Sequence, residues 1–275
     1  MKLIYNNLDV VKWVNENKAA KIGFIPTMGA LHKGHLSLVE KAKKYADKIV
    51  VSIFVNPTQF GDRNDFVNYP CTTKEDLALL EELNVDMVFL PSSAEELYSN
   101  ENYQPFSLHS IDSVMEGSYR KGHFDGVVRV VKLFLDLIQP DFAFFGEKDY
   151  QQLLIIKKLI DNIGIKTKII SCQTLREKDG LAMSSRNRRL SASERALAAN
   201  LYKVLSFCKE KYSPNTIAEM EKVCLQKLAE FSNPDYFEIR NAEDLSKKGS
   251  IDTKWRAFTA TKLGEVRLID NIALN

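Results

Sequence analysis

The sequence predicts an α/β protein, with a Rossmann-like, doubly wound parallel sheet followed by a smaller C-terminal α+β domain. Over about the first 170 residues, short apolar runs alternate with amphipathic stretches, which is typical of parallel strands joined by helical crossovers. After about residue 172 this alternation stops. The length of 275 residues also exceeds the commonest domain size of about 100–150 residues. We therefore predict domains at 1–172 and 173–275.

Each predicted strand of the first domain is a short apolar run, and each predicted helix spaces its apolar residues three or four apart. The expected strands are Ile22–Pro26, Ile49–Val55, Asp86–Leu90, Phe142–Phe145 and Ile165–Ile170. The expected helices are Leu36–Ala46, Lys74–Leu83, Val127–Ile138 and Tyr150–Ile160. Ligands of a doubly wound sheet bind beyond the carboxyl ends of its strands, so the turns that follow these strands are the expected site.

The C-terminal part begins with a polar, basic segment at Thr174–Leu190. Two helical stretches follow, at Ser193–Cys208 and Thr216–Phe231. The chain then carries three strand-like runs, at Tyr236–Arg240, Trp255–Thr261 and Val266–Ile269. Helices followed by consecutive strands indicate an α+β arrangement.

Composition and charge exclude several classes of protein. Lys and Arg number 38 against 36 Asp and Glu, and this net charge of +2 argues against nucleic-acid binding by bulk charge. The longest apolar stretch, Ile49–Val55, is far short of the ~20 residues that a membrane span requires. The first 17 residues include Asp9 and Glu16 and do not resemble a signal peptide. We expect a soluble, cytoplasmic protein without nucleic-acid or membrane partners.

The cysteines support the same expectation. Zinc sites and disulfide frameworks usually place cysteines in close pairs, and this chain has no CxxC pair. We predict no metal ligands in the protein and no disulfide, as in a reducing cytosol. The widely scattered cysteines are Cys71, Cys172, Cys208 and Cys224.

The strongest candidate for chemistry is the turn PTMGALHKGH at 26–35, between the first predicted strand and its helix. His32 and His35 would lie near the N-terminus of that helix, where free backbone N–H groups and a partial positive charge favour phosphate. Gly29 and Gly34 would let backbone approach a ligand closely. Imidazole N–H donors could stabilise charge on an α-phosphate as pyrophosphate leaves. The alternatives are exposed loop histidines or zinc ligands, and zinc would need two further ligands.

Two other strand ends carry suitable side chains. Gln59 follows the second predicted strand, and its amide could hold a hydroxyl and a carboxylate oxygen of a small hydroxy acid; a loop glutamine bonded to backbone is the alternative. Lys148 and Asp149 follow the strand Phe142–Phe145, where Lys148 offers a charge for phosphates and Asp149 a ribose contact or a helix cap. Gln152 is expected to face the same cleft, whereas Gln151 is expected to point elsewhere.

These residues lie in blocks that resemble a known family. His-x-Gly-His at 32–35 resembles the signature of the nucleotidyltransferase superfamily related to class I aminoacyl-tRNA synthetases. The longer string IPTMGALHKGHLSLVEKA is similar to the pantothenate synthetase (pantoate–β-alanine ligase) family. Four further blocks resemble that family in the same order: FVNPTQFG at 54–61, GHFDGV at 122–127, FGEKDYQQ at 145–152 and REKDGLAMSSRN at 176–187. Five ordered blocks are a far more specific signal than one.

The fifth block contains Met183-Ser184-Ser185-Arg186, which looks like the KMSKS-type loop of the superfamily, with Arg186 where a lysine is usual. Serine hydroxyls and a guanidinium suit a mobile clamp on the β- and γ-phosphates of a nucleotide. A solvated basic linker is the alternative reading. Arg188 and Arg189 are expected to be ordinary surface charges.

The resemblance implies an ATP-dependent ligase that condenses (R)-pantoate with β-alanine. Pantoate attacks ATP to give pantoyl adenylate and pyrophosphate with Mg²⁺ assistance, and β-alanine then displaces AMP. Catalytic roles are implied for His35, His32 and Lys148, and pantoate contacts for Gln59 and Gln152. The implied ATP-binding residues are Met28, Gly29, Ala30, Leu31, His32, Lys33, Gly34, His35, Gly146, Glu147, Lys148, Asp149, Leu175, Met183, Ser184, Ser185 and Arg186.

Several points stay open at this stage. His123 could be a third imidazole of the site or a structural residue, and Phe142, Phe144 and Phe145 are expected in the core rather than stacked on adenine. The apolar helix Val127–Ile138 suggests burial against the sheet or a partner, and the resemblance implies a homodimer. Arg129 and Cys71 depart from the family pattern. The rival functions are a nucleotidyltransferase acting on a mononucleotide or phosphopantetheine, and a nucleotide-binding regulator without chemistry.

Overall fold

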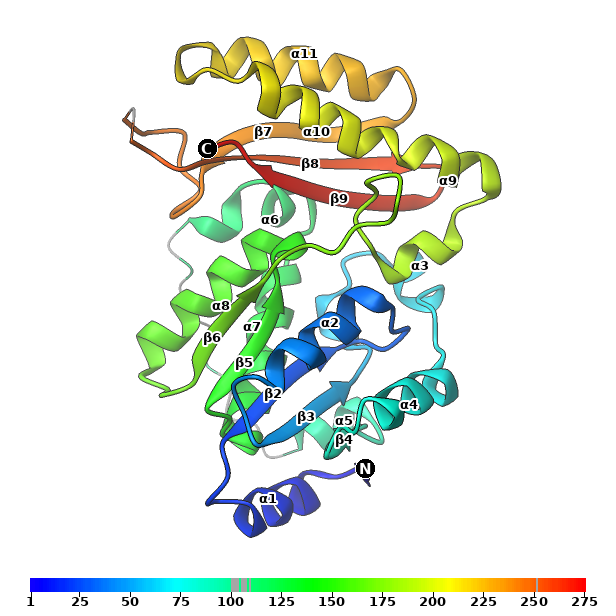
Figure 1. Cartoon of the computed structure of the whole chain (residues 1–275), viewed down its shortest axis with the longest axis vertical. Helices are drawn as coiled ribbons and strands as arrows, with labels where there is room; N and C mark the ends of the chain where they lie inside the picture. The colour runs from blue at the N-terminus through cyan, green and yellow to red at the C-terminus, as the bar shows by residue number, and fades with distance from the viewer. Residues whose placement is uncertain (100–103, 105–107, 109, 251) are drawn as a thin grey trace.

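The first part of the chain forms a six-stranded, entirely parallel sheet (Figure 1). This computed structural model describes residues 1–99, 104, 108, 110–250 and 252–275. The strands lie side by side in the order β1 (Lys2–Ile4), β4 (Met87–Phe89), β3 (Lys48–Ile53), β2 (Ile22–Thr27), β5 (Phe142–Gly146) and β6 (Lys168–Cys172). The predicted doubly wound sheet is confirmed.

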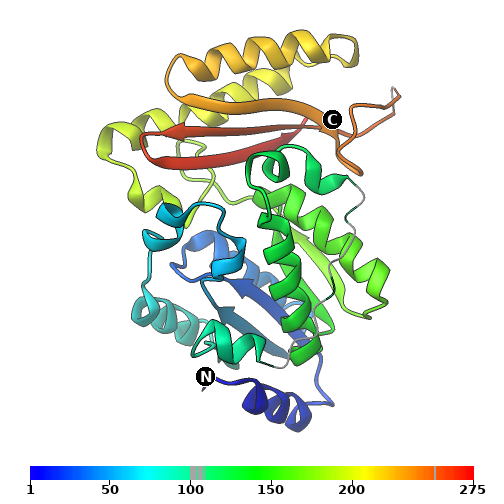
Figure 2. The same cartoon turned by 180° about the vertical axis from the view of Figure 1, so that it is seen from behind.

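Helices cover both faces of this sheet because alternate residues of its strands point to opposite sides. On β2, Phe24 joins an apolar cluster with α1 (Asn7–Glu16), α7 (His123–Ile138) and α8 (Tyr150–Ile163). The next residue, Ile25, joins a second cluster with α2 (Lys33–Ala42) and α4 (Thr73–Glu82). Figure 1 shows α2 in front of the sheet, and Figure 2 shows α7 on the opposite face. Ten of the sixteen residues of α7 are buried within this one chain, which explains its apolar sequence.

The sheet opens between β2 and β5, and this opening positions the site. From β2 the chain adds β3 and β4 on one side, and it later returns to add β5 and β6 on the other side. Strands β2 and β5 pair only at Gly23–Phe142 and Phe24–Ala143, whereas β2 and β3 pair along six residues. The carboxyl ends of β2 and β5 therefore separate at the switch point, where a doubly wound sheet binds its ligands.

The C-terminal part is a three-stranded antiparallel sheet with two helices on one face. It contains α9 (Ala192–Ala198), α10 (Asn200–Lys211), α11 (Ile217–Ala229), β7 (Asn233–Asn241), β8 (Trp255–Leu263) and β9 (Val266–Ala273). Phe258 and Ala260 on its other face belong to the same apolar cluster as α7, so the sheet lies between α10–α11 and the first part (Figure 1). The α+β expectation is confirmed, and the division at residue 172 stays a prediction.

Short elements are where the sequence prediction falls short. Strand β1 has three residues, too few for a periodic pattern, and it forms because it pairs with β4. The predicted helix Ser193–Cys208 is two helices that meet at Ala199. The sequence prediction also missed the ten-residue helix α1. The short helices are α3 (Arg63–Val67), α5 (Ala94–Tyr98) and α6 (Glu116–Tyr119). The 3₁₀ turns are η1 (Pro57–Gln59), η2 (Ile111–Ser113), η3 (Glu147–Asp149), η4 (Ser185–Arg189) and η5 (Pro214–Thr216). In the described part of the chain, no helix has the length and apolarity to cross a membrane.

Candidate active site

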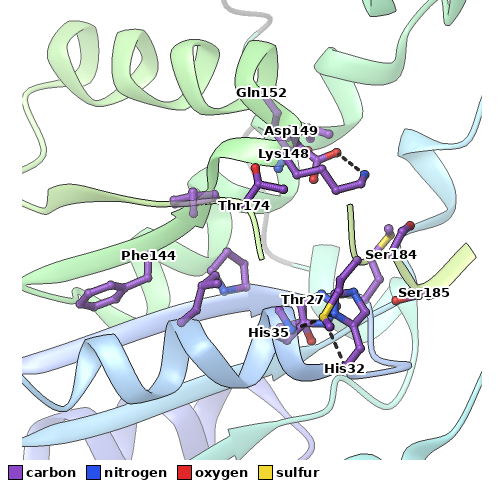
Figure 3. A pocket seen from close by; sticks show the side chains of 18 of the residues that line it. Thr27, His32, His35, Phe144, Lys148, Asp149, Gln152, Thr174, Ser184 and Ser185 are labelled. Atoms are coloured by element: carbon purple, nitrogen blue, oxygen red, sulfur yellow. Dashed lines mark hydrogen bonds and ion pairs between the residues drawn. The ribbon is translucent and has the colours of Figure 1, made fainter. Parts of the chain in front are cut away.

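A cavity of about 210 Å³ lies beyond the carboxyl ends of β2 and β5. Figure 3 shows Lys148, Asp149 and Gln152 on one side of it and His32, His35 and Ser184 on the other. The sequence-predicted residues that line it are Met28, His32, Gly34, His35, Gln59, Gly146, Lys148, Asp149, Gln152, Leu175, Met183, Ser184, Ser185 and Arg186. The predicted residues outside its lining are Gly29, Ala30, Leu31, Lys33 and Glu147.

The two histidines of the site are held in one tautomer by backbone N–H groups. Nδ1 of His32, the residue that caps α2, accepts from the N–H of Gly34 at 3.1 Å. Nδ1 of His35 accepts from the N–H of His32 at 3.4 Å. Because each Nδ1 is an acceptor, the hydrogen of each neutral ring is on Nε2. Both rings therefore offer Nε2–H as a donor.

Both imidazoles are neutral at pH 7. Burial, with coulombic contributions from His35 and Lys148, lowers the pKa of His32 to about 3. Burial also lowers the pKa of His35 to about 4, with Lys148 as the second cause. The pair can therefore donate hydrogen bonds to a ligand, but the positive charge beside it comes from Lys148.

The backbone at the start of α2 corrects the expectation of free N–H groups for phosphate. The N–H of Gly34 bonds to the ring of His32, and those of His35 and Leu36 bond to the carbonyl of His32. The N–H groups of Ala30 and Leu31, both buried, donate to Asp76. Ala30 and Leu31 therefore lie behind the cavity wall, whereas His32, Gly34 and His35 border the ligand space.

Gln59 reaches the cavity from η1, directly after β3. Its side chain is buried, with Nε2 at 2.8 Å from Sδ of Met28 and Oε1 accepting from Nδ2 of Asn56 at 3.3 Å. A sulfur atom is a weak acceptor, so the amide keeps donor capacity for a ligand. The predicted position of Gln59 in the cleft is found in the structure.

The backbone of η1 is held against α7 by two residues. Nδ1 of His123 lies 2.7 Å from the carbonyl oxygen of Gln59, and its Nε2 lies 3.0 Å from Nη1 of Arg120. A Cβ on Gly126 would lie 2.4 Å from the carbonyl oxygen of Thr58, so only glycine permits this approach. Of the two readings of His123, the structure supports the structural one.

Lys148 is presented by the turn η3, which the C-terminal sheet holds in place. Nδ2 of Asn271 donates to the carbonyls of Glu147 at 2.9 Å and Lys148 at 2.8 Å. The carboxylate of Glu147 turns to Arg256, at 3.4 Å, which is why it does not line the cavity. Nζ of Lys148 lies 3.7 Å from Oδ1 of Asp149. Strand β9 thus fixes the backbone from which Lys148 reaches the cavity.

The neighbouring glutamines on α8 separate as expected. Gln152 lines the cavity. Gln151 is buried elsewhere, where it accepts from the N–H of Glu116 and donates to the carbonyls of Ile111 and Val114. The prediction that Gln151 points away from the cleft is confirmed.

The basic segment is more ordered than a solvated linker. Arg186 forms two hydrogen bonds with Asp65, at 2.7 and 3.2 Å, and Arg189 adds a third at 2.8 Å. Burial alone would raise the pKa of Asp65, but the hydrogen bonds and charge of Arg186 lower it below its usual value. Ser185 donates to the carbonyl of Ala30 at 2.9 Å. The expectation that Arg188 and Arg189 are plain surface charges is wrong, since Arg188 also bonds to the backbone.

Sequence reasoning missed the apolar wall of the cavity. Helix α7 and the end of β3 supply it with Phe54, Val127, Val130, Val131 and Phe134. The signal was that α7 is apolar nearly all round, which predicts burial but does not distinguish a core from the wall of a ligand cavity. Phe144 and Phe145 are buried as expected, yet both also border the cavity. The other lining residues that were not predicted are Pro26, Thr27, Leu38, Tyr69, Gln173 and Thr174.

The fold and the cavity together define a class of protein: an α/β enzyme that binds a nucleoside phosphate at the switch point of a doubly wound sheet. Paired neutral donors next to a lysine suit a phosphate whose charge changes during a reaction. The wall of apolar side chains beside Gln59 adds room for a small second substrate.

Comparisons with known proteins identify the family. The pantoate-beta-alanine ligase family model matches residues 2–273. The pantothenate synthetase of Bacteroides thetaiotaomicron is 41% identical, over 99% of this chain and 98% of that protein. The crystal structure of pantothenate synthetase from Thermus thermophilus superposes with a TM-score of 0.91 at 36% identity, covering 100% of this chain and 99% of that one. The crystal structure of pantoate-beta-alanine ligase from Francisella tularensis, complexed with beta-gamma ATP and beta-alanine, superposes with a TM-score of 0.84 at 36% identity. The match covers 100% of this chain and 98% of that one.

The chain belongs to the pantoate–β-alanine ligase family, and its activity is the ATP-dependent condensation of pantoate with β-alanine. This decides against the nucleotidyltransferase and the inactive regulator.

Proposed function

We propose that the cavity makes pantothenate in two steps. The carboxylate of pantoate attacks the α-phosphorus of ATP, giving pantoyl adenylate and pyrophosphate. The amine of β-alanine then attacks the activated carbonyl, giving pantothenate and AMP. The observation that carries this assignment is the placement of Gln59 after β3 and of Gln173–Leu175 after β6, on opposite sides of the histidines that follow β2. Two substrates can thus meet above His32 and His35.

Pantoate takes the β3 side of the cavity. Gln59 from the β3 side and Gln152 from α8 supply amides that can both donate to its carboxylate and accept from its hydroxyl groups. The apolar side chains of Val127 and Val131 suit the two methyl groups of pantoate. A small acid with both polar and apolar faces matches this half of the cavity.

ATP takes the β5–β6 side. Gly146 has open space where a Cβ would lie, which leaves room for a nucleoside next to the backbone. Asp149, with its side chain 47% exposed, can accept from a ribose hydroxyl. Leu175 and Met183 border the same side, and their backbones are joined by a hydrogen bond of 3.0 Å.

The charge that develops at the α-phosphate is stabilised by side chains. Nε2–H of His35 and of His32 donate to phosphate oxygens, and Lys148 adds the positive charge that neutral rings lack. The loss of one such donor typically lowers turnover by about 10²–10³-fold. No protein nucleophile is needed, because the chain positions two reactants and stabilises charge.

Magnesium is assigned to the nucleotide and not to a protein cage. Within the described residues there is no group of three His, Cys, Asp or Glu side chains that could hold a metal ion. Asp149 is the only carboxylate among the described residues that line the cavity. These residues fit an ion that is carried by the ATP phosphates, as Mg²⁺ commonly is, with Asp149 as the nearest protein oxygen donor. When bound, the ion neutralises phosphate charge.

The C-terminal part, from about residue 173, is assigned the role of a lid. Ser184, which caps η4, and Arg186, which lies within it, line the cavity and suit the β- and γ-phosphates. An acyl adenylate must be shielded from water, because its carbonyl would otherwise be hydrolysed. Opening of this segment after pyrophosphate leaves would admit β-alanine.

The order of the two steps can be tested by isotope exchange. Labelled pyrophosphate should exchange into ATP when pantoate is present and β-alanine is absent, and AMP and pantothenate should accumulate once β-alanine is added. Exchange that requires β-alanine would make the reaction concerted and refute the adenylate. Exchange without pantoate but with a mononucleotide would restore the nucleotidyltransferase reading.

The assembly and the compartment complete the proposal. We expect a homodimer, which light scattering would show as about twice the 31.3 kDa mass of the chain. We also expect the cytoplasm, since Cys71, Cys172, Cys208 and Cys224 are all free thiols.

A further inference from the structure

One buried carboxylate touches the histidine turn without reaching the cavity. Asp76, on α4, is 1% exposed. Its Oδ2 accepts from the N–H of Ala30 at 2.8 Å, and its Oδ1 accepts from the N–H of Leu31 at 2.8 Å. The hydroxyl of Thr72 donates to Oδ1 at 3.1 Å. Every contact of this carboxylate with the turn is made to the backbone just before His32.

The backbone of that turn has the shape of an anion-binding concavity. Gly29 and Ala30 have φ angles of +77° and +48°, and this conformation points successive N–H groups at one spot. For Ala30 the left-handed conformation is strained, because its Cβ crowds the following carbonyl oxygen. A Cβ on Gly29 would lie 3.0 Å from Oδ2 of Asp76. A protein carboxylate thus fills the place that phosphate was expected to take.

The same stretch of backbone is also held from its other side. The peptide group between Ala30 and Leu31 donates its N–H to Asp76 and accepts from Ser185 at its carbonyl. The carbonyl of Leu31, the last before His32, accepts from Nη2 of Arg188 at 3.1 Å. An anion on one side and the η4 segment on the other leave this peptide little freedom to rotate.

We propose that Asp76 is a positioning residue that aims the Nε2–H of His32 at the nucleotide. The inference rests on the proposed role of His32. Without the negative charge, the strained turn at Ala30 loses the bonds that compensate it. Because His32 follows Leu31 directly, its ring would then shift, and a misplacement of about 1 Å at a reacting centre can cost about 100-fold in rate.

Asp76→Asn is the informative variant. An asparagine presents one oxygen and one NH₂ group, so one of the two backbone donors at Ala30 and Leu31 would face another donor. Glu75→Gln is the matched control, because Glu75 is exposed on the same turn of α4 and loses the same charge. The assay is pantoate-dependent pyrophosphate exchange, with kcat and KM for pantoate determined separately.

We expect Asp76→Asn to lower the exchange kcat by about 10–100-fold, with the KM for pantoate within about threefold of wild type. Glu75→Gln should match wild type. In a His32→Ala background the same Asp76→Asn change should cost less than about threefold, because its effect acts through the missing ring.

The double-mutant cycle separates the possible failures. Wild-type exchange in His32→Ala would refute the role of His32 in the proposed function. If His32→Ala is slow and the losses in rate of His32→Ala and Asp76→Asn multiply in the double variant, only the positioning by Asp76 is refuted. If Asp76→Asn does not fold, Thr72→Val removes one bond to the carboxylate and keeps its charge. A loss in Thr72→Val that vanishes in the His32→Ala background supports the proposal, and full activity in Thr72→Val would assign Asp76 to the fold alone.

Discussion

The neutral state of the histidines predicts how the first step responds to pH. With a pKa of about 4, His35 would be about 1% protonated at pH 6, whereas an ordinary histidine with a pKa of 6.5 would be about 75% protonated. The pKa of His32, about 3, gives an even smaller fraction. Lowering the pH from 8 to 6 should therefore leave both donors unchanged.

The assay compares wild type with His35→Asn, in which no imidazole titrates at this position. The kcat/KM for Mg-ATP in pantoate-dependent pyrophosphate exchange reports groups of the free enzyme. Titration of ATP and pyrophosphate affects both proteins alike, so it cancels in the ratio of their rates. We expect this ratio to stay constant within about 1.2-fold between pH 8 and pH 6, where a histidine of ordinary pKa would change it by about fourfold.

A ratio that changes with a midpoint between pH 6 and 7 would refute the reasoning. It would mean that His35 titrates as an exposed imidazole, and that burial does not set its charge. A flat ratio combined with a loss of about 10²–10³-fold in His35→Asn would support catalysis by a neutral donor.

Three further predictions concern other residues of the site. Gln59→Ala should raise the KM for pantoate by about 5–150-fold with little change for Mg-ATP, since a buried polar group of the ligand loses its partner; equal losses for both substrates would indicate a collapsed cleft. Arg186→Ala should slow adenylate formation more than the single-turnover reaction of preformed adenylate with β-alanine, because its phosphate partners leave with pyrophosphate; equal slowing would contradict the lid. Burial lowers the pKa of His123 to about 3, so the unfolded chain takes up the proton first as pH falls through 6.5. The free energy of unfolding should therefore fall by about 2 kcal/mol more between pH 7 and 5 in wild type than in His123→Asn, and equal slopes in urea unfolding would disprove it.

The parallel sheet was predictable because its central strands are buried on both faces. Such strands appear in the sequence as continuous apolar runs, as at Ile49–Val55 for β3. Strand β1 was not predictable in this way. Its three residues form a strand because Met87, Val88 and Phe89 offer an edge to pair with, and that edge exists only in the folded sheet.

The part of the site built from strand ends was also predictable. Residues directly after parallel strands meet at one edge of the sheet, so Gln59 and Lys148 come together although they are far apart in the chain. The apolar wall from α7 was not predictable, because a valine that lines a cavity and a valine that faces the core follow the same pattern in a sequence. Asp65, which bonds to Arg186 from a short helix, gave no periodic signal either.

For the turn at 29–31, the sequence predicts the backbone shape but not the group that the turn binds. A glycine turn between a strand and a helix implies converging N–H donors, and the structure has them at Ala30 and Leu31. A sequence does not say which anion they meet, and here Asp76, 45 residues further along, arrives through the packing of α4 on the sheet. Because these two donors are taken, the proposed site relies chiefly on side chains to bind the phosphate. In the proposed mechanism the neutral rings of His32 and His35 supply directed hydrogen bonds and Lys148 supplies charge, so the backbone would contribute to catalysis by fixing where those rings point.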